Sequence, residues 1–582
     1  MGEQVKIADL AAALQRRTRR ELSDVANALS PYRLAVLSGR TPSGLAVAPR
    51  DLRAGDKAKG AAILSGRFAL GGETMTLEAG ESVWTRPAPS RRFAAALHGF
   101  DWLRDLLSVE EPEAAAFAET LVDDWIAEFG AWNWFAWDPA ILGRRIGAWI
   151  AAGEALFGDA EPDAARRRLA SLARQTRRLR RTLPLMAPDR DRLTASINHA
   201  MAAVCLDAGG RALGDANALL ASDLTAQILP DGGHVSRNPE TAADALIGLV
   251  TLEEAAVRRG VELHGEARRA IDRLAPMVRF FRMPDGGLAA FHGGGQGDAR
   301  AITTALEMAD GAEKTFEFAP HSGYHRAEAA GAVVVLDAGG PARGPHAAEA
   351  HASALAFALS APGGRIVVNC GWSADQPAPW REAVRATAAH SVLTLEETSS
   401  ARLLQPGMRR SLLGPRVAEG PEPVKARRNE EDMGVWLEAS HDGYRARYGL
   451  SLRRRLFLAA DGGDLRGEDG LFRPVEDGPP DDPEARLRFA IRFHLHPDVR
   501  ASLSRDSMSA LLVLPNGDGW RFRTDGGPVR LERSVYLAAG APPRRSIQLV
   551  VSGDAEPYGG GDRPPNRVRW AFQRLGRVGA AG

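Results

Sequence analysis

The runs that decide the fold class of this chain are Ala332-Val-Val-Val-Leu336, Leu355-Ala-Phe-Ala-Leu359 and Arg365-Ile-Val-Val-Asn369. Each is rich in apolar and β-branched residues and is bounded by Gly or Pro, which is typical of strands in an antiparallel sheet. Histidines gathered at strand ends could bind a metal, orient a sugar or move protons near neutral pH, or they could be ordinary surface and turn residues. The same stretch, residues 319–395, carries His321, His325, His346, His351 and His390.

The region from Phe93 to about Met308 has the periodicity of helices instead. Loops of a few residues between helices of this length make antiparallel neighbours. No repeat of fixed period appears, so a regular solenoid is not expected. Helical hairpins in a curved array fit this pattern, and their concave side would form a long cleft. The predicted helices cover 112–129, 140–156, 163–183, 191–208, 211–228, 240–259 and 264–281.

The two ends of the chain differ from this helical body. Residues 57–84 show short alternation punctuated by glycine, which predicts a small β element. After residue 395, strands separated by Gly, Asp and Pro turns predict a multi-stranded sandwich. We therefore predict an N-terminal helix with a small β element at 1–90, a helical domain at 91–312 and an antiparallel β-sandwich at 313–582.

Residues 5–29 are predicted to form a basic amphipathic helix. Such a helix could bind a membrane surface or nucleic acid, but a helix docked on the protein with its basic face in solvent is the simpler interpretation. Its apolar stripe would contain Ile7, Leu10, Leu14, Leu22, Val25 and Leu29, with Arg16, Arg17, Arg19 and Arg20 facing away.

Composition excludes several classes of protein. The 582 residues suggest two or three domains, and 74 basic against 73 acidic residues give no bulk attraction to nucleic acid. The first residues lack the apolar core of a secretory signal, and no later run is long and apolar enough for a membrane helix. Two cysteines exclude a disulfide framework. We expect a soluble cytoplasmic protein, with association with the cell envelope as an alternative.

Four ordered motifs follow one another between residues 322 and 391. They are Ser322-Gly-Tyr-His-Arg326, Glu349-Ala-His-Ala-Ser-Ala-Leu-Ala-Phe357, Val367-Val-Asn-Cys-Gly371 and Arg385-Ala-Thr-Ala-Ala-His-Ser391. Their order and spacing resemble the β-sheet domain of the heparinase II/III-type polysaccharide lyases. The resemblance implies an α+β multidomain protein, in which an N-terminal incomplete α/α toroid precedes a C-terminal antiparallel β-sandwich. It also implies a lyase that cleaves an acidic, uronate-containing polysaccharide or oligosaccharide by β-elimination between the two domains.

Such an elimination needs a neutraliser for the uronate carboxylate, because removing the neighbouring proton adds charge beside it. The loop Leu229-Pro-Asp-Gly-Gly-His-Val-Ser-Arg-Asn-Pro-Glu240 resembles the loop that grips this carboxylate in the lyases. The resemblance makes Asn238 and His234 the neutraliser candidates, with Arg237 as a second clamp on the substrate.

The elimination also needs a base and an acid, commonly Tyr or His. Tyr324 is the best tyrosine by position, and His351 of the second motif is a further catalytic candidate. The lyases carry a tyrosine roughly fifty residues past the gripping loop, and this chain has none there. His292 is the nearest titratable substitute.

Three positions resemble those that bind a structural zinc in some of these lyases. They fall on His351, Asn369 and His390, but the middle one is a carboxylate in that pattern and an amide here, which makes a weak zinc site. We therefore expect no required cofactor and zinc that is absent or sub-stoichiometric. Glu349 stands where the pattern has a histidine, and we take it as a substrate-binding candidate.

A tryptophan cluster precedes the second predicted helix of the body. Flat aromatic faces stack on sugar rings, so Trp132, Trp134 and Trp137 could line the floor of a glycan cleft. The alternative is that they fill cores between helices. Because three tryptophans in six residues cannot easily face one core, at least one should reach the cleft.

Two other classes of function stay open. The first is a non-catalytic glycan-binding or envelope-associated protein that kept the fold and lost the base. The second is a glycoside hydrolase, which needs a separated pair of carboxylates at the cleft. Glu240 and Glu349 are the pair that the sequence offers.

Overall fold

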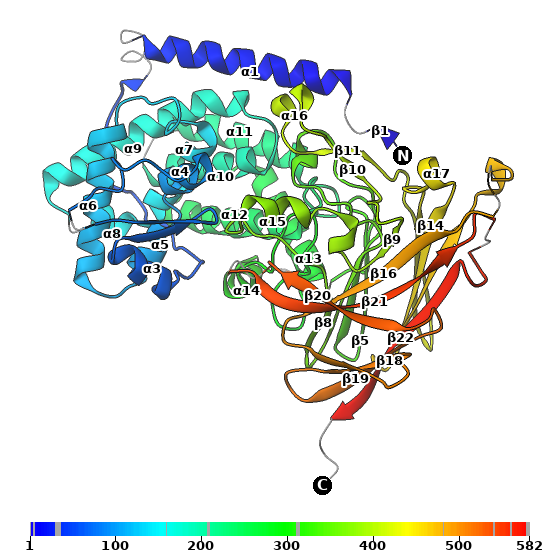
Figure 1. Cartoon of the computed structure of the whole chain (residues 1–582). Helices are drawn as coiled ribbons and strands as arrows, with labels where there is room; N and C mark the ends of the chain where they lie inside the picture. The colour runs from blue at the N-terminus through cyan, green and yellow to red at the C-terminus, as the bar shows by residue number, and fades with distance from the viewer. Residues whose placement is uncertain are drawn as a thin grey trace.

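A helical domain followed by a β-sandwich makes up the computed structural model of the chain (Figure 1). This confirms the predicted fold class. The helical domain ends with α14 (Ala299–Met308), and the first strand of the sandwich, β4, begins at Phe318. The residues that the structure describes are 2–3, 6–29, 37–78, 80–158, 160–206, 210–309, 315–480, 482, 484–538, 542–558 and 561–577.

The toroid is a set of helices packed side by side. In it α10 lies against α7, α11 and α12, and α12 in turn lies against α13 and α14. A short helix, α3 (Lys57–Leu64), and the hairpin β2 (Arg67–Leu70) and β3 (Glu73–Thr76) precede it. Its longer helices are α4 (Arg91–Gly99), α6 (Pro112–Phe129), α7 (Pro139–Ala151), α9 (Pro162–Thr182), α10 (Arg190–Cys205), α11 (Gly210–Gln227), α12 (Pro239–Arg259) and α13 (Gly265–Phe281).

The sequence fixes where many of these helices begin. Short polar side chains at the N-cap accept hydrogen bonds from the free backbone N–H groups of the first turn. Proline at the first helical position, as in α6, α7, α9 and α12, has no N–H to satisfy and a suitable φ. The capping side chains are Asp56, Asp138, Asp189, Asn238 and Asp298.

Most tryptophans of the helical domain lie in a core between helices. Trp102 stacks on Phe100 with ring centroids 5.1 Å apart, and Trp125 meets Trp149 edge to face at 5.6 Å. The fully buried guanidinium of Arg145 lies 4.1 Å from the centre of the Trp125 ring. These rings therefore stabilise the packing of α4, α6 and α7.

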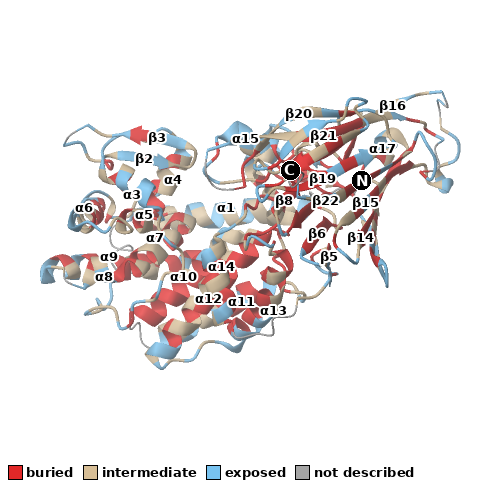
Figure 2. Ribbon diagram, turned by 90° about the horizontal axis from the view of Figure 1, so that it is seen from below, coloured by how far each residue is buried: buried red, intermediate tan, exposed pale blue. Residues whose placement is uncertain are grey.

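The sandwich contains two large sheets whose inner faces are buried (Figure 2). The nine-stranded sheet runs β20-β21-β16-β8-β7-β6-β5-β4, with β9 paired to β16, and the eight-stranded sheet runs β12-β13-β14-β15-β22-β19-β18-β17. Phe357 and Trp570 stack between them at 5.4 Å. The strands of the first sheet are β4 (Phe318–Ala319), β5 (Tyr324–Ala329), β6 (Ala332–Asp337), β7 (Phe357–Ala361), β8 (Gly364–Val368), β9 (Leu393–Leu395), β16 (Leu487–Leu495), β20 (Val529–Tyr536) and β21 (Arg544–Ala555).

Every pairing in both sheets is antiparallel, as expected. The strands of the second sheet are β12 (Lys425–Glu431), β13 (Gly434–His441), β14 (Ser451–Ala459), β15 (Asp464–Phe472), β17 (Arg500–Leu503), β18 (Ser509–Val513), β19 (Asp518–Thr524) and β22 (Arg567–Arg577).

The first helix, α1 (Ile7–Ala28), lies across the top of the molecule over both domains (Figure 1). It contacts α16 (Met408–Leu413) of the sandwich, and Asp24 forms an ion pair with Arg178 of α9. The strand β1 (Gly2–Glu3) that precedes it pairs with β11 (Val417–Gly420). The helix therefore bridges the toroid and the sandwich.

The orientation of α1 corrects one prediction. Leu10 packs on Leu404 and Leu413, but the rest of the apolar stripe faces solvent, and the helix turns much of its polar side toward the protein. We expected the apolar stripe to dock on the protein and the basic face to lie in solvent, and this expectation was wrong. Hydrophobic periodicity shows that the helix is amphipathic, but it does not show which of the two faces contacts the protein. The exposed members of the stripe are Ile7 (85% exposed), Leu14 (56%), Leu22 (64%), Val25 (65%) and Leu29 (61%). Across the described ranges, no helix is both long enough and apolar enough to traverse a bilayer.

Candidate functional site

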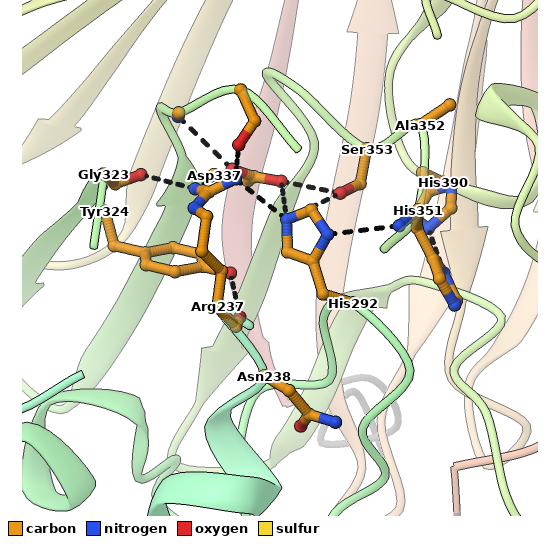
Figure 3. A network of polar contacts seen from close by, with 12 residues as sticks. Arg237, Asn238, His292, Gly323, Tyr324, Asp337, His351, Ala352, Ser353 and His390 are labelled. Atoms are coloured by element: carbon orange, nitrogen blue, oxygen red, sulfur yellow. Dashed lines mark hydrogen bonds and ion pairs between the residues drawn. The ribbon is translucent and has the colours of Figure 1, made fainter. Parts of the chain in front are cut away.

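The predicted gripping loop lies between α11 and α12 and faces the sandwich. It closes on itself through a bridge between Ile228 and His234, and it ends where Asn238 caps α12. Arg237 adopts a φ of 62°, in the left-handed region. This turn directs the Arg237 side chain toward the sandwich (Figure 3).

His234 is buried, and both of its ring nitrogens have partners within the helical domain. The backbone N–H of Ser236 donates to Nδ1 at 3.1 Å, so the proton of the neutral ring lies on Nε2, which donates to Gln227 Oε1 at 3.0 Å. Burial lowers the pKa of His234 well below its usual value. His234 is therefore a neutral ring that holds the loop, with no free nitrogen for a substrate.

The side-chain oxygen of Asn238 is engaged in hydrogen bonds with the backbone, whereas the side-chain nitrogen is not. Its Oδ1 accepts from the N–H groups of Glu240 at 2.9 Å and Thr241 at 3.4 Å. Its Nδ2 is buried and has no hydrogen-bond partner among the described residues. Asn238 therefore retains one donor that a carboxylate or another acceptor could use.

Arg237 and His292 from the toroid meet Asp337 and Ser353 from the sandwich in one buried network (Figure 3). Arg237 Nη2 donates to Asp337 Oδ1 at 2.5 Å. Ser353 Oγ donates to Asp337 Oδ2 at 2.6 Å, and His292 Nε2 lies 3.0 Å from the same oxygen. Arg237 also donates to the carbonyls of Ser322, Gly323 and Gly340.

Both ring nitrogens of His292 have partners within the protein. Its Nδ1 accepts from the backbone N–H of His351 at 3.2 Å, and its Nε2 lies 3.0 Å from Asp337 Oδ2 and 2.9 Å from Nη1 of Arg237. Burial lowers the pKa of His292, although Asp337 opposes this effect. Burial alone would raise the pKa of Asp337, but Arg237 and His292 hold it well below its usual value. The network is therefore an ion pair between Arg237 and Asp337 with a neutral histidine beside it.

Tyr324 belongs to the same network and is fully buried. Its hydroxyl donates to the carbonyl oxygen of Arg237 at 2.7 Å, and the Arg237 guanidinium lies 4.7 Å from the centre of its ring. Burial raises the pKa of Tyr324 well above its usual value. The structure thus brings together Arg237, Tyr324 and His292, but it places all three out of contact with solvent.

The three predicted zinc ligands lie beside one another without facing a common point. His390 donates from Nδ1 to the Ala386 carbonyl at 2.8 Å, so its Nε2 accepts from His351 Nδ1 at 3.1 Å. Asn369 Oδ1 accepts from the backbone N–H of Ser391 at 3.0 Å. Only His351 Nε2, which is buried and unpartnered, keeps a free lone pair. These residues do not fit a zinc ion, and no group of three His, Cys, Asp or Glu side chains in the described part of the chain could hold one.

The two acidic candidates, Glu240 and Glu349, lie beside a cavity in the helical domain. Glu349 forms an ion pair with Arg190 at 3.4 Å, and Glu240 accepts from the Gly295 N–H at 2.8 Å. Burial and the neighbouring Asp244 raise the pKa of Glu240. A cavity of about 380 Å³ opens beside them between α7, α10 and α12, and its lining includes Arg50, Arg53, Arg104, Arg144 and Arg190.

The three tryptophans of the predicted cleft floor lie away from this cavity, whose lining contains none of them. Trp137 is buried and donates to the Phe129 carbonyl, and Trp132 is partly buried against the core. Trp134 is 61% exposed, with the Arg91 guanidinium 5.6 Å from its ring centre.

Sequence reasoning missed Asp337, which joins the two halves of the network. A signal was present, because Asp337-Ala-Gly339 directly follows the apolar run 332–336. Ser353 lies in the second motif and also bonds to this carboxylate.

This arrangement of side chains suits ligand binding better than proton transfer. A general base must reach the proton it removes and must have a pKa near the working pH. Here the buried tyrosine is hard to ionise, and the buried histidines, including His351, are weak bases. Asn238 Nδ2 and His351 Nε2 remain as one donor and one acceptor for a ligand.

Comparisons with known proteins agree with this fold. Residues 311–571 match the family described as "Heparinase II/III-like, C-terminal". The chain is 38% identical over 549 residues to FtsZ-localized protein C of Caulobacter vibrioides, covering 94% of this chain and 92% of that protein. The crystal structure of heparinase III superposes with a TM-score of 0.66 at 14% identity, covering 99% of this chain and 93% of that one. The heparan sulfate lyase HepC from Pedobacter heparinus gives a TM-score of 0.55 at 14% identity, covering 99% and 92%. This chain belongs to the heparinase II/III-like family.

Proposed function

We propose that this chain is a non-catalytic, envelope-associated member of the heparinase II/III-like family, which binds ligands with a lyase fold and does not cleave them. The observation that carries the proposal is that three candidate acid and base groups are buried and have their polar side-chain atoms in hydrogen bonds within the protein. The fourth, His351, keeps a free Nε2, but burial lowers the pKa of His351 well below its usual value. Tyr324, His292 and His234 are each buried and hydrogen-bonded to protein atoms. None has an atom left to remove the proton of a uronate.

A feature of the toroid supports retained binding. Five arginines line the cavity between α7, α10 and α12, against four aspartates. Four of these arginines pair with protein carboxylates, and Arg50 alone among the five has no such partner in the described part of the chain. Guanidinium groups pair with carboxylates through two parallel hydrogen bonds, so Arg50 is the group that an acidic polysaccharide or oligosaccharide would reach.

The outward stripe of α1 supports association with the envelope. Apolar side chains that face solvent along a whole helix, flanked by the exposed Arg17 and Arg19, match helices that lie in the surface of an anionic membrane. The relative from Caulobacter is named for its localisation with FtsZ, and its similarity spans nearly the whole of both chains. We extend this location to the present chain, at the site of cell division.

Ultraviolet absorbance of unsaturated uronate tests the loss of catalysis. We expect no increase when the purified chain is mixed with heparan, chondroitin, hyaluronan, alginate or bacterial uronate polymers. Turnover of any of them that Asn238→Ala removes would restore the lyase assignment and sink the proposal.

Vesicle sedimentation tests the envelope association. We expect binding to phosphatidylglycerol vesicles and little to phosphatidylcholine vesicles. Leu14→Glu should abolish it, because it places a charge in the stripe, whereas Ala8→Glu adds the same charge to an exposed position beside the stripe and should reduce it far less. Equal loss for both variants would show that net charge, and not the stripe, is what binds.

A further inference from the structure

The outer face of the eight-stranded sheet carries two neighbouring rows of side chains that differ in charge. One row alternates in sign from strand to strand, since register pairs Arg427 with Glu438, Glu438 with Arg455, Arg455 with Glu468 and Glu468 with Arg569. Ion pairs link its members, with Arg455 Nη1 3.2 Å from Glu468 and Arg569 Nε 3.4 Å from it. This row neutralises itself.

The second row contains no carboxylate from β13 to β19. Register aligns Trp436 with Phe457, Phe457 with Arg466, Arg466 with Ala571 and Ala571 with Arg523. Trp436 is 40% exposed and covers Phe457, whose ring centroid is 4.7 Å away. Arg466 has an ion pair with Asp464 at 2.8 Å, whereas the exposed Arg523 has no carboxylate within ion-pair distance among the described residues.

A hollow of about 530 Å³ lies over this second row. The hollow forms because the small side chain of Ala571 lies between the long side chains of Arg466 and Arg523. Adjacent strands lie about 4.8 Å apart, so these two arginines stand roughly 10 Å from each other across the alanine. Arg569 borders the hollow from the first row, and Trp436 forms its aromatic end. Two carboxylates also line it: Glu468 pairs with Arg455 and Arg569, and Asp525 accepts from the backbone N–H of Arg569.

We propose that this hollow is a second binding site, which takes an acidic saccharide: the anionic group lies over Ala571 between Arg466 and Arg523, and a sugar ring stacks on Trp436. Guanidinium groups bind carboxylate and sulfate strongly, and an exposed indole offers the flat face that a pyranose ring covers. The site is on the far side of the sheet from the network around Asp337, so it does not depend on the proposed loss of catalysis.

The geometry favours a saccharide over an acidic peptide. Extended peptides bind sheets through the free backbone groups of an edge strand. This hollow lies on the side-chain face of central strands, away from the edge strands β12 and β17, and offers no such groups.

Titration of the full-length chain with oligogalacturonate, followed by hydrogen exchange, tests the site. We expect slower exchange in residues 434–441 and 518–524 on saturation. Arg523→Ala and Trp436→Ala should each raise, at least tenfold, the oligogalacturonate concentration that gives half-maximal protection. Arg521→Ala is the matched control, because Arg521 lies two residues away on the same face, bonds to Gln573 and does not line the hollow.

The outcomes separate this site from the toroid cavity and from plain charge attraction. Protection confined to the toroid, or an Arg521→Ala effect equal to that of Arg523→Ala, would overturn the proposal. So would equal binding of polyglutamate that Trp436→Ala leaves unchanged, since that result would mean an acidic peptide surface. Neutral dextran should give no protection, and unchanged melting temperatures of the three exposed-face variants would exclude unfolding as the cause of weaker binding.

Discussion

Asp337 lies at the end of a strand of the sandwich, but both of its ionisable partners, Arg237 and His292, come from the toroid. A buried ion pair stabilises little by itself, yet removal of one partner leaves the other charge buried without compensation. This carboxylate therefore locks the two domains against each other. The same contact leaves His292 without a free nitrogen.

Asp337→Asn should destabilise the chain by about 3 to 5 kcal/mol, because it leaves the Arg237 guanidinium buried and unpaired. Ser353→Ala removes only one hydrogen bond to the same carboxylate and should cost about 1 kcal/mol. Urea unfolding measures both. If the two substitutions cost the same, the ion pair does not lock the domains.

Tyr324→Phe distinguishes a structural tyrosine from a catalytic one. The substitution removes the hydrogen bond to the Arg237 carbonyl and little volume, so we expect a loss of about 1 kcal/mol of stability. Binding of acidic glycan should be unchanged. A large fall in any elimination rate at an unchanged melting temperature would instead identify a catalytic hydroxyl.

At the level of residues, the sequence identified which side chains gather but not how their atoms pair. Arg237, His292 and Tyr324 were all singled out from motif positions, and the structure brings them within contact of each other. Their burial could not be predicted, because it arises only where a toroid loop meets strand ends some fifty to one hundred residues away. Asp337 follows an apolar strand run and could have been singled out, but its pairing with Arg237 and His292 could not.

The N-terminus of α12 depends on one side chain. Asn238→Ala removes the cap and should destabilise the chain by about 1 kcal/mol, whereas Asn238→Ser keeps an accepting oxygen and should retain most of that stability. Thermal unfolding compares the two variants. Equal destabilisation would mean that Asn238 acts mainly through its unpartnered Nδ2 and not as a cap.

Elements were predicted better than their orientations. The helices of the toroid and the strands of the sandwich follow from hydrophobic period and turn residues. For α1 the period gave the helix and its stripe, but it could not give the side on which the helix docks. That side is set by Leu10 on Leu404 and Leu413, and by the ion pair between Asp24 and Arg178.

The molecule as a whole should be sensitive to acid. Burial lowers the pKa of eleven of its thirteen histidines, so these rings stay neutral in the folded chain where they would be protonated in the unfolded one. Stability is therefore present above the unfolded pKa of about 6.5 and is lost as the pH falls below it, by up to about 1.4 kcal/mol per pH unit for each such ring. The eleven are His98, His199, His234, His292, His325, His346, His351, His390, His441, His494 and His496.

Melting temperatures between pH 7.5 and pH 5 check this expectation. We expect a steep fall that begins near pH 6.5, well above the range in which carboxylates titrate. A flat profile down to pH 5 would mean that the buried rings are already charged in the folded chain.

The pairing of β1 with β11 joins a segment that is synthesised early to one that is synthesised much later. Residues 2 and 3 leave the ribosome well before their partner strand, which ends at Gly420 and follows the whole toroid. At 5 to 20 residues per second, roughly 20 to 80 s separate the two events. During that interval α1 is attached to a nascent chain that still lacks the part of the sandwich on which α1 docks. Its apolar stripe has already been synthesised. A ribosome translating this message could therefore be drawn to a membrane before the protein is complete.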